Sequence, residues 1–180
     1  KSAVPASNAH KNNTKTLAVV DTSLMHLVFN DQGDITQSDL KKYPVSIKDK
    51  SPISLLGAQN GQYYQMQSGL VKSSSKNATQ DKMVFSTKKA KYVIADGAKS
   101  INVKFIGKDK NGLLLVKNYR ILNNSYAIDL DYSIKNTGAK AWKGSFYGQI
   151  QRVPPPAKTG LGLMGFHSYT GTSFSSPDNL

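Results

Sequence analysis

The sequence contains no cysteine, and its 11 acidic residues are all aspartate, so glutamate is absent as well. The lack of cysteine excludes disulfides and thiolate chemistry. The lack of glutamate, a common helix former, argues against many surface helices. No apolar run approaches the ~20 residues that a membrane helix needs, so the sequence predicts no transmembrane helix.

Negative charge is also scarce relative to positive charge. There are 24 Lys and Arg against 11 Asp, which gives 24 − 11 = +13, and only Arg120 and Arg152 are arginine. Dispersed lysines are typical of strands that must stay soluble with protected edges. Recognition of nucleic acid usually also needs arginine pairs or stacked aromatic residues, so we expect no nucleic-acid partner. Contact with an anionic lipid surface stays open as an alternative.

The residues that are present predict strands. In the segment 125–135, Tyr126, Ile128, Leu130, Tyr132 and Ile134 alternate with polar residues, which is the period of a half-buried strand. Residues 30–34 and 108–112 carry turn chemistry with Gly33 and Gly112, and residues 136–138 are expected to close a hairpin onto the next strand.

Twelve strands are predicted, and several are apolar on both faces, which indicates two packed sheets. The predicted fold class is therefore all-β, an antiparallel β-sandwich. A short helix at Ser38–Lys42 or in 51–60 is an alternative. The predicted strands are 17–21, 24–29, 34–40, 45–48, 53–56, 62–67, 83–86, 91–95, 99–106, 113–122, 125–135 and 141–152.

Residues able to carry catalysis are few and scattered. The histidines, His10, His26 and His167, form no pair at metal-ligand spacing, so we expect no metal site and no cofactor. Asp129 and Asp131 lie at i and i+2 on one strand face, where they could serve as an acid/base pair, but a solvated polar face explains them better. The segment 159–165 is rich in glycine, yet it lacks the features of a phosphate-binding loop.

Several short motifs occur in one order along the chain and together resemble the large periplasmic domain of the YidC family of bacterial membrane-protein insertases. The longest is DTSLMHLVFNDQGDITQSDLKKYP at Asp21–Pro44. The others are Ser54–Leu56, Gln65–Leu70, Tyr92–Gly97, Phe146–Gln149, Pro154-Pro155, Tyr169–Gly171 and Ser175–Asp178. The stretch 72–81 and the loop Pro154–Gly165 depart from the family pattern.

The resemblance implies a β-supersandwich, similar to aldose-epimerase-like sugar enzymes, that is incomplete at the C-terminus of this chain. We expect residues 1–15 to be a polar flexible linker and 16–180 to be the N-terminal part of the domain. The family places this domain at the periplasmic face of the inner membrane. It implies a non-catalytic docking or scaffold role toward SecD, SecF and the Sec translocon, with nascent membrane proteins handled by the parent protein.

The family's contact region matches roughly Leu161–Leu180. Phe166, His167, Tyr169 and Phe174 are the candidate partner-binding residues, because aromatic side chains supply much of the energy of interfaces; packing onto the sandwich edge is the alternative for them.

Two other functions stay open. The first is a carbohydrate-binding or sugar-processing sandwich, in which Trp142, Tyr147, Tyr63 and Tyr64 stack on sugar rings. Aldose-epimerase-like enzymes use histidine and glutamate as acid and base, and this chain has no glutamate. The second is a chaperone-like groove in which an unpaired strand edge accepts an extended peptide.

Overall fold

The computed structural model describes residues 15–59, 62–72 and 83–153, and these form strands, turns and loops without a helix. The strands are β1 (Thr16–Asp21), β2 (Met25–Asn30), β3 (Ile35–Pro44), β4 (Pro52–Gln59), β5 (Gln62–Lys72), β6 (Phe85–Thr87), β7 (Lys91–Val93), β8 (Ser100–Lys108), β9 (Leu113–Leu122), β10 (Ile128–Asn136) and β11 (Gly144–Arg152). The predicted all-β class is confirmed. Within this part of the chain, no helix has the length and hydropathy needed to cross a bilayer.

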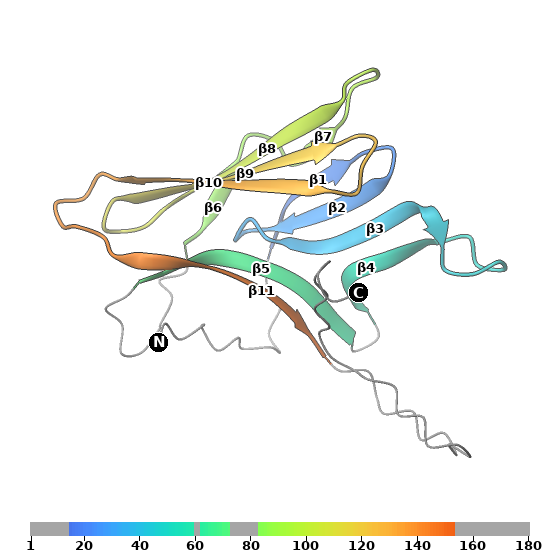
Figure 1. Cartoon of the computed structure of the whole chain (residues 1–180), viewed down its shortest axis with the longest axis horizontal. Helices are drawn as coiled ribbons and strands as arrows, with labels where there is room; N and C mark the ends of the chain where they lie inside the picture. Colours follow the sequence, from blue (N-terminus) through green and yellow to red (C-terminus); the bar gives the residue numbers. More distant parts are fainter. Residues whose placement is uncertain (1–14, 60–61, 73–82, 154–180) are drawn as a thin grey trace, which may run out of the picture.

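The strands form two sheets that face each other as a sandwich. The seven-stranded sheet has the order β11-β5-β4-β3-β2-β1-β7, and the four-stranded sheet has the order β10-β9-β8-β6. Neighbouring strands pair antiparallel, except that β1 and β7 run parallel. Figure 1 shows that β5 and β11 of the seven-stranded sheet diverge from the four-stranded sheet along their length. Among the described strands, the four-stranded sheet therefore does not lie over the whole length of β5 and β11.

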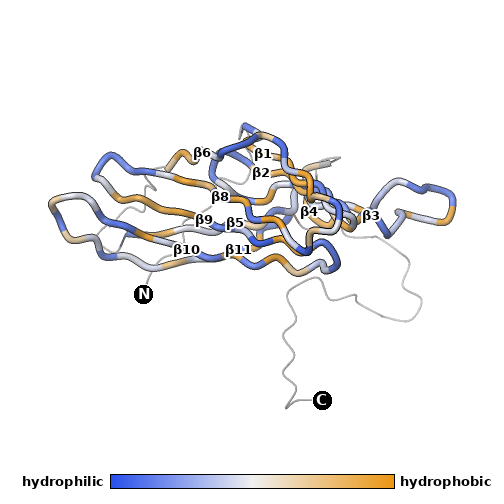
Figure 2. The backbone as a smooth tube through the Cα atoms, turned by 90° about the horizontal axis from the view of Figure 1, so that it is seen from above, coloured by the Kyte–Doolittle hydropathy of each residue, from blue (hydrophilic) through white to orange (hydrophobic). Residues whose placement is uncertain are grey.

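A hairpin arm, residues 41–52, projects from the body between β3 and β4 (Figure 1). Pro44 pairs with Pro52 near its base, and the amide of Val45 donates to the carbonyl of Ser51 at 2.9 Å. In Figure 2 the outer end of this arm is apolar and is flanked by hydrophilic segments. The arm is ordered by its own hydrogen bonds although it lies away from the core.

Several sequence-based expectations about these segments need correction. The segment Ser38–Lys42 belongs to β3 and most of 51–60 to β4, so neither forms a short helix. Residues 45–48 form the tip of the arm and not a strand. Ser46 and Asp49 close a turn in this segment, with the Ser46 amide donating to the Asp49 carbonyl at 3.1 Å.

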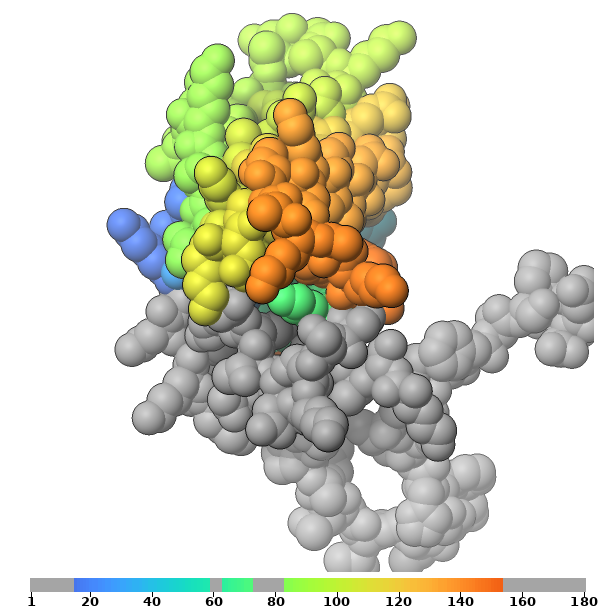
Figure 3. All heavy atoms as spheres, turned by 90° about the vertical axis from the view of Figure 1, so that its left-hand side faces the viewer, coloured from blue at the N-terminus to red at the C-terminus, as the bar shows by residue number. Residues whose placement is uncertain are grey.

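The predicted hairpin around residues 136–138 is also wrong. The two strands that flank this turn lie in different sheets, because β10 pairs with β9 and β11 pairs with β5. Thr137 instead donates its hydroxyl and its amide to the carbonyl of Gly112, at 2.7 and 3.0 Å. The turn therefore rests on the β8–β9 turn, and Figure 3 shows the surfaces of these two segments in contact (yellow and orange).

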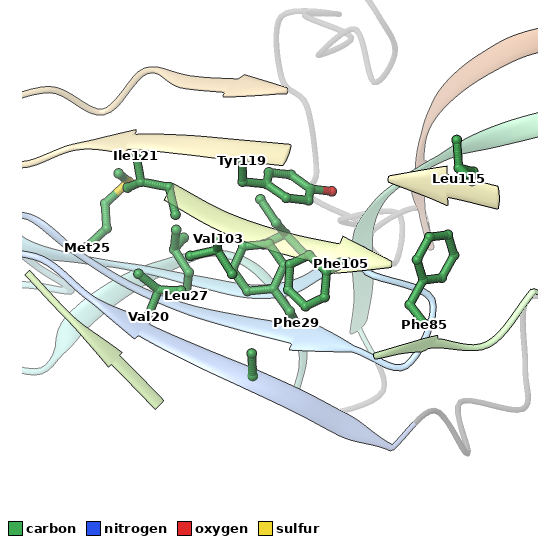
Figure 4. Close-up of a cluster of buried hydrophobic side chains, with 12 residues drawn as sticks. Val20, Met25, Leu27, Phe29, Phe85, Val103, Phe105, Leu115, Tyr119 and Ile121 are labelled. Carbon is green, nitrogen blue, oxygen red and sulfur yellow. The ribbon is translucent and has the colours of Figure 1, made fainter. Parts of the chain in front are cut away.

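The core lies between the sheets and is filled by the inward positions of β1, β2, β8 and β9. Phe29, Phe105 and Tyr119 form its aromatic centre, with ring centroids 4.9 to 5.8 Å apart (Figure 4). Gly33 approaches the ring of Phe105 closely and has φ = 66°, a conformation that favours glycine. The predicted turns at 30–34 and 108–112 are confirmed, the second with Gly112 at φ = 90°.

Candidate functional site: a polar bridge between the sheets

Strand β9 carries a lysine in the middle of its inward row. Leu113, Leu115, Lys117, Tyr119 and Ile121 are all buried, while the residues between them are half-buried or exposed. The side chain of Lys117 is only 1% exposed. An ammonium group in such a position must find a counter-ion and hydrogen-bond acceptors, because burying an unpaired charge is very costly.

The counter-ion is Asp34, the residue immediately before β3 of the opposite sheet. The Lys117 Nζ atom lies 2.6 Å from Asp34 Oδ1, whose side chain is 4% exposed. Asp34 is held by the turn before it, since its amide donates to Asn30 Oδ1 at 2.9 Å and its carbonyl accepts from the Asn30 amide at 3.0 Å. The Asn-Asp-Gln-Gly-Asp turn therefore aims the carboxylate into the sandwich.

Ser68 on β5 and Tyr132 on β10 complete the polar bridge. Lys117 Nζ also donates to the Ser68 carbonyl at 2.9 Å, and the Ser68 amide donates to Asp34 Oδ1 at 3.3 Å. Tyr132 lies directly opposite Lys117 in the β9–β10 pair and donates its hydroxyl to Ser68 Oγ at 2.6 Å. The Lys117 ammonium also lies 5.1 Å from the centre of the Phe85 ring.

Burial and pairing act in opposite directions on these charges. Burial raises the pKa of the Asp34 carboxyl, and the ammonium of Lys117 opposes that rise. Burial likewise lowers the pKa of Lys117, and Asp34 opposes that fall. Burial also raises the pKa of the Tyr119 hydroxyl far above its ordinary value, and Tyr119 donates to the Gly33 carbonyl at 2.7 Å. Neither charge of the ion pair is tolerable without the other.

The polar bridge therefore holds the two sheets together. It does not present ionisable groups to a substrate. Its ion pair is sealed from solvent, and its donors and acceptors are used by one another. Replacing such a pair with apolar residues is often neutral or stabilising, but removing one partner is strongly destabilising. The arrangement fixes which parts of the two sheets meet, namely the β2–β3 turn, β5 and the pair β9–β10.

Beyond this bridge the inner face of β5 and β11 is apolar and partly uncovered. Residues directly opposite in an antiparallel pair share a face, and Phe146, Ile150 and Met66 share one with Ser68. The ring of Phe146 packs edge-on against Tyr132, with centroids 4.9 Å apart, yet Phe146 remains 57% exposed and Ile150 66% exposed. This edge of the sandwich is suited to contact with another surface.

The predicted partner-binding residues Phe166, His167, Tyr169 and Phe174 lie outside the described residues, as do His10, the Gly-rich segment 159–165 and nearly all of the predicted linker 1–15. Their assignment stays a prediction.

Asp129 and Asp131 do not form a site. Both are exposed, and Asp129 lies 3.6 Å from Arg120, directly across the β9–β10 pair. His26 has a structural role: its Nδ1 lies 3.0 Å from Asp21 Oδ1, which also accepts from Lys41 Nζ at 2.9 Å. Within the described ranges, no group of three metal-ligating side chains occurs.

The four aromatic residues considered for sugar stacking do not form one platform. Tyr63 and Tyr64 are neighbours on β5 and so point to opposite faces, with Tyr63 buried. Tyr147 lies opposite Gly69, which is six residues or about 20 Å along β5 from Tyr63. The ring of Trp142 lies against Gly144. These positions give no support to the sugar-binding alternative.

The polar bridge was missed by the sequence-based interpretation, although a signal was present. Lys117 breaks the apolar row of odd-numbered residues in 113–121, and a lysine at an inward position requires a buried acid. The sequence gives no direct means of choosing Asp34 as its partner, since 83 residues separate them.

Comparisons with known proteins agree with the motifs. The model of the family described as the YidC periplasmic domain matches residues 17–180. A relative from Coxiella burnetii (strain RSA 493 / Nine Mile phase I), named membrane protein insertase YidC, is 34% identical over 163 residues, covering 89% of this chain and 28% of that protein. Relatives of the same name from Nitrosococcus oceani and Marinobacter nauticus are 33% and 29% identical, over 91% and 82% of this chain.

These comparisons place the β-sandwich in a class of domains that occur in membrane protein insertases. The chain belongs to the YidC periplasmic domain family. It spans less than a third of the length of these relatives, between 26% and 30%.

Proposed function

We propose that this chain is a non-catalytic domain of a YidC-like insertase, held at the periplasmic face of the inner membrane, where it assists insertion and folding of membrane proteins. Its work is to dock accessory subunits of the Sec translocon, SecD and SecF. Membership of the YidC periplasmic domain family carries the proposal.

The geometry of the sandwich supports a docking role over a catalytic one. The buried ionisable groups are sealed and occupied with one another, so they cannot reach a substrate. Large apolar side chains are instead exposed on β11, at the edge of the sandwich, including Phe146 and Ile150. Interfaces draw much of their energy from such side chains.

The docking proposal is tested by the binding of purified SecF to the whole chain. Replacing Tyr169 and Phe174 together with serine is expected to weaken binding at least tenfold, while circular dichroism stays unchanged. Val93→Ser, at an exposed position on β7, is the matched control and should bind as the parent does. Loss of the folded signal in the double variant would instead place these residues in the core, and unchanged binding would contradict their role in docking.

A further inference from the structure

The hairpin arm at residues 41–52 combines exposed apolar side chains with positive charge. Tyr43, Val45 and Ile47 are 53%, 55% and 89% exposed, although each could bury apolar area. Ile47 stands at the tip, in the turn closed by Ser46 and Asp49. Large aliphatic side chains held this far from a core have no role in folding that the described residues reveal.

The same arm is strongly basic. It contains four lysines and one aspartate, so its charge is 4 − 1 = +3. Lys41 is engaged at the base by Asp21, at 2.9 Å. Lys42, Lys48 and Lys50 are exposed and form no side-chain hydrogen bond or ion pair with any described residue. Three ammonium groups of the arm therefore remain available, and two of them, those of Lys48 and Lys50, belong to residues close in sequence to Ile47.

The arm is organised before it meets any partner. At its base the rings of Tyr43 and Tyr126 lie 5.8 Å apart, and Lys41 Nζ also donates to the Thr22 carbonyl at 2.9 Å. At its tip the Asp49 carboxylate accepts from the amide and the hydroxyl of Ser51, and these bonds lower the pKa of Asp49. A preformed arm loses little conformational freedom on binding.

We infer that the arm docks on a bilayer surface that carries anionic lipid headgroups, with Ile47 entering the interfacial region and Lys42, Lys48 and Lys50 lying among the headgroups. This goes beyond docking to Sec subunits and uses other residues. Basic side chains around a small apolar surface are the pattern of interfacial membrane binding. A protein partner fits less well, because the centres of protein interfaces are depleted of lysine and enriched in arginine and aromatic residues.

The chain itself makes a sharp test feasible, because it has no cysteine. Ile47→Cys can be labelled at one site with an environment-sensitive fluorophore and mixed with vesicles of phosphatidylglycerol and phosphatidylcholine. We expect a blue shift and an intensity gain with these vesicles, none with pure phosphatidylcholine, and loss of the signal in high salt. The same label at Val93→Cys, which is 61% exposed beside Lys88, Lys89 and Lys91, should not shift.

Variants that remove positive charge test the inference in a second way. Replacing Lys42, Lys48 and Lys50 together with glutamine should weaken vesicle binding about a hundredfold, given the attraction of each lysine to an anionic surface. Ile47→Ser should weaken it about tenfold. The matched triple replacement of Lys88, Lys89 and Lys91 removes the same charge and should change binding much less.

Equal losses in the two triple variants, an equal shift at positions 47 and 93, or no binding to anionic vesicles would overturn the inference. All the substituted side chains are exposed, so circular dichroism is expected to match the parent in each case. SecF binding is measured separately, so failure of lipid binding leaves the docking proposal standing, and the reverse also holds.

Discussion

Lys117 on β9 and Asp34 in the turn before β3 of the other sheet lie 83 positions apart in the chain, yet their charged atoms are 2.6 Å apart in the interior of the sandwich. The ammonium also reaches the Ser68 carbonyl, so a single side chain joins β9 to the β2–β3 turn and to β5. This contact determines how the two sheets face each other.

Lys117→Met is expected to lower the free energy of unfolding by about 3–5 kcal/mol, because it leaves the Asp34 carboxylate buried without its counter-ion. Adding Asp34→Asn should recover part of this loss, since no charge is then left unpaired. Urea denaturation of the single and double variants gives the coupling energy. Lys104→Met, on the exposed side of β8, is the control and should change stability by less than about 0.5 kcal/mol. Additive effects of the two substitutions would contradict the pairing.

The buried Tyr119 hydroxyl makes stability depend on alkaline pH. Burial keeps this group protonated in the folded state, whereas in the unfolded chain it ionises near its ordinary value of 10.0. Above pH 10 the unfolded state therefore binds fewer protons than the folded state, and stability falls as the pH rises, by up to about 1.4 kcal/mol per pH unit. The stability lost between pH 9 and 11 should be smaller in Tyr119→Phe than in the parent. Parallel pH curves for the two proteins would disprove the assignment.

Asp21 is expected to contribute in the acid range. Burial alone would raise the pKa of its carboxyl, but hydrogen bonds and charge from Lys41 and His26 outweigh burial and lower it below 3.8. Its contribution to stability is therefore present above about pH 4 and lost as the pH falls through the lowered pKa. Thermal unfolding should show Asp21→Asn less stable than the parent at pH 6 by a few tenths of a kcal/mol to about 1 kcal/mol, since the pair is partly exposed. This difference should shrink toward pH 2, and a difference that grows toward low pH would be inconsistent with the assignment.

The outermost strand of the larger described sheet should promote association between copies of the chain. β11 is paired on one side only, within the part of the chain described, and exposes Phe146 and Ile150. Such an edge favours pairing with other strands. Light scattering at increasing concentration is expected to show self-association that Ile150→Lys reduces. Ile106→Lys on β8, at a position 45% exposed, serves as control, and a parent that stays monomeric at high concentration would refute the expectation.

Local patterns were enough to predict most of the strands and the two glycine turns, although the predicted strand 45–48 is the tip of the arm. In β10 every second residue from Ile128 to Tyr132 is half-buried and the aspartates between them are exposed, as the alternation predicts. Gly33 and Gly112 both adopt positive φ at turns that the sequence marks. These features depend on residues close together in the chain, where backbone preferences and the period of two are decisive.

Long-range pairing was not predictable from the same patterns. The turn at residues 136–138 looks like a hairpin, and nothing local shows that the next strand pairs with β5 instead of β10. Lys117 could be recognised as an inward lysine, but the identity of its partner depends on how the sheets pack. Tyr63, Tyr64 and Tyr147 do not form one platform for sugar stacking, because their faces and spacing depend on the register of β5 and β11.

The chain passes from one sheet to the other between β10 and β11, and this connection also affects how the domain can fold during synthesis. β11 pairs along its full length with β5, so Arg152 meets Tyr64 across a separation of 88 positions. Loop closure of this kind slows folding, because chain entropy is lost before the new contacts form. During synthesis, the edge of β5 that later pairs with β11 therefore stays unpaired until β11 has been made. Throughout that interval the nascent domain is exposed to mispairing of this edge.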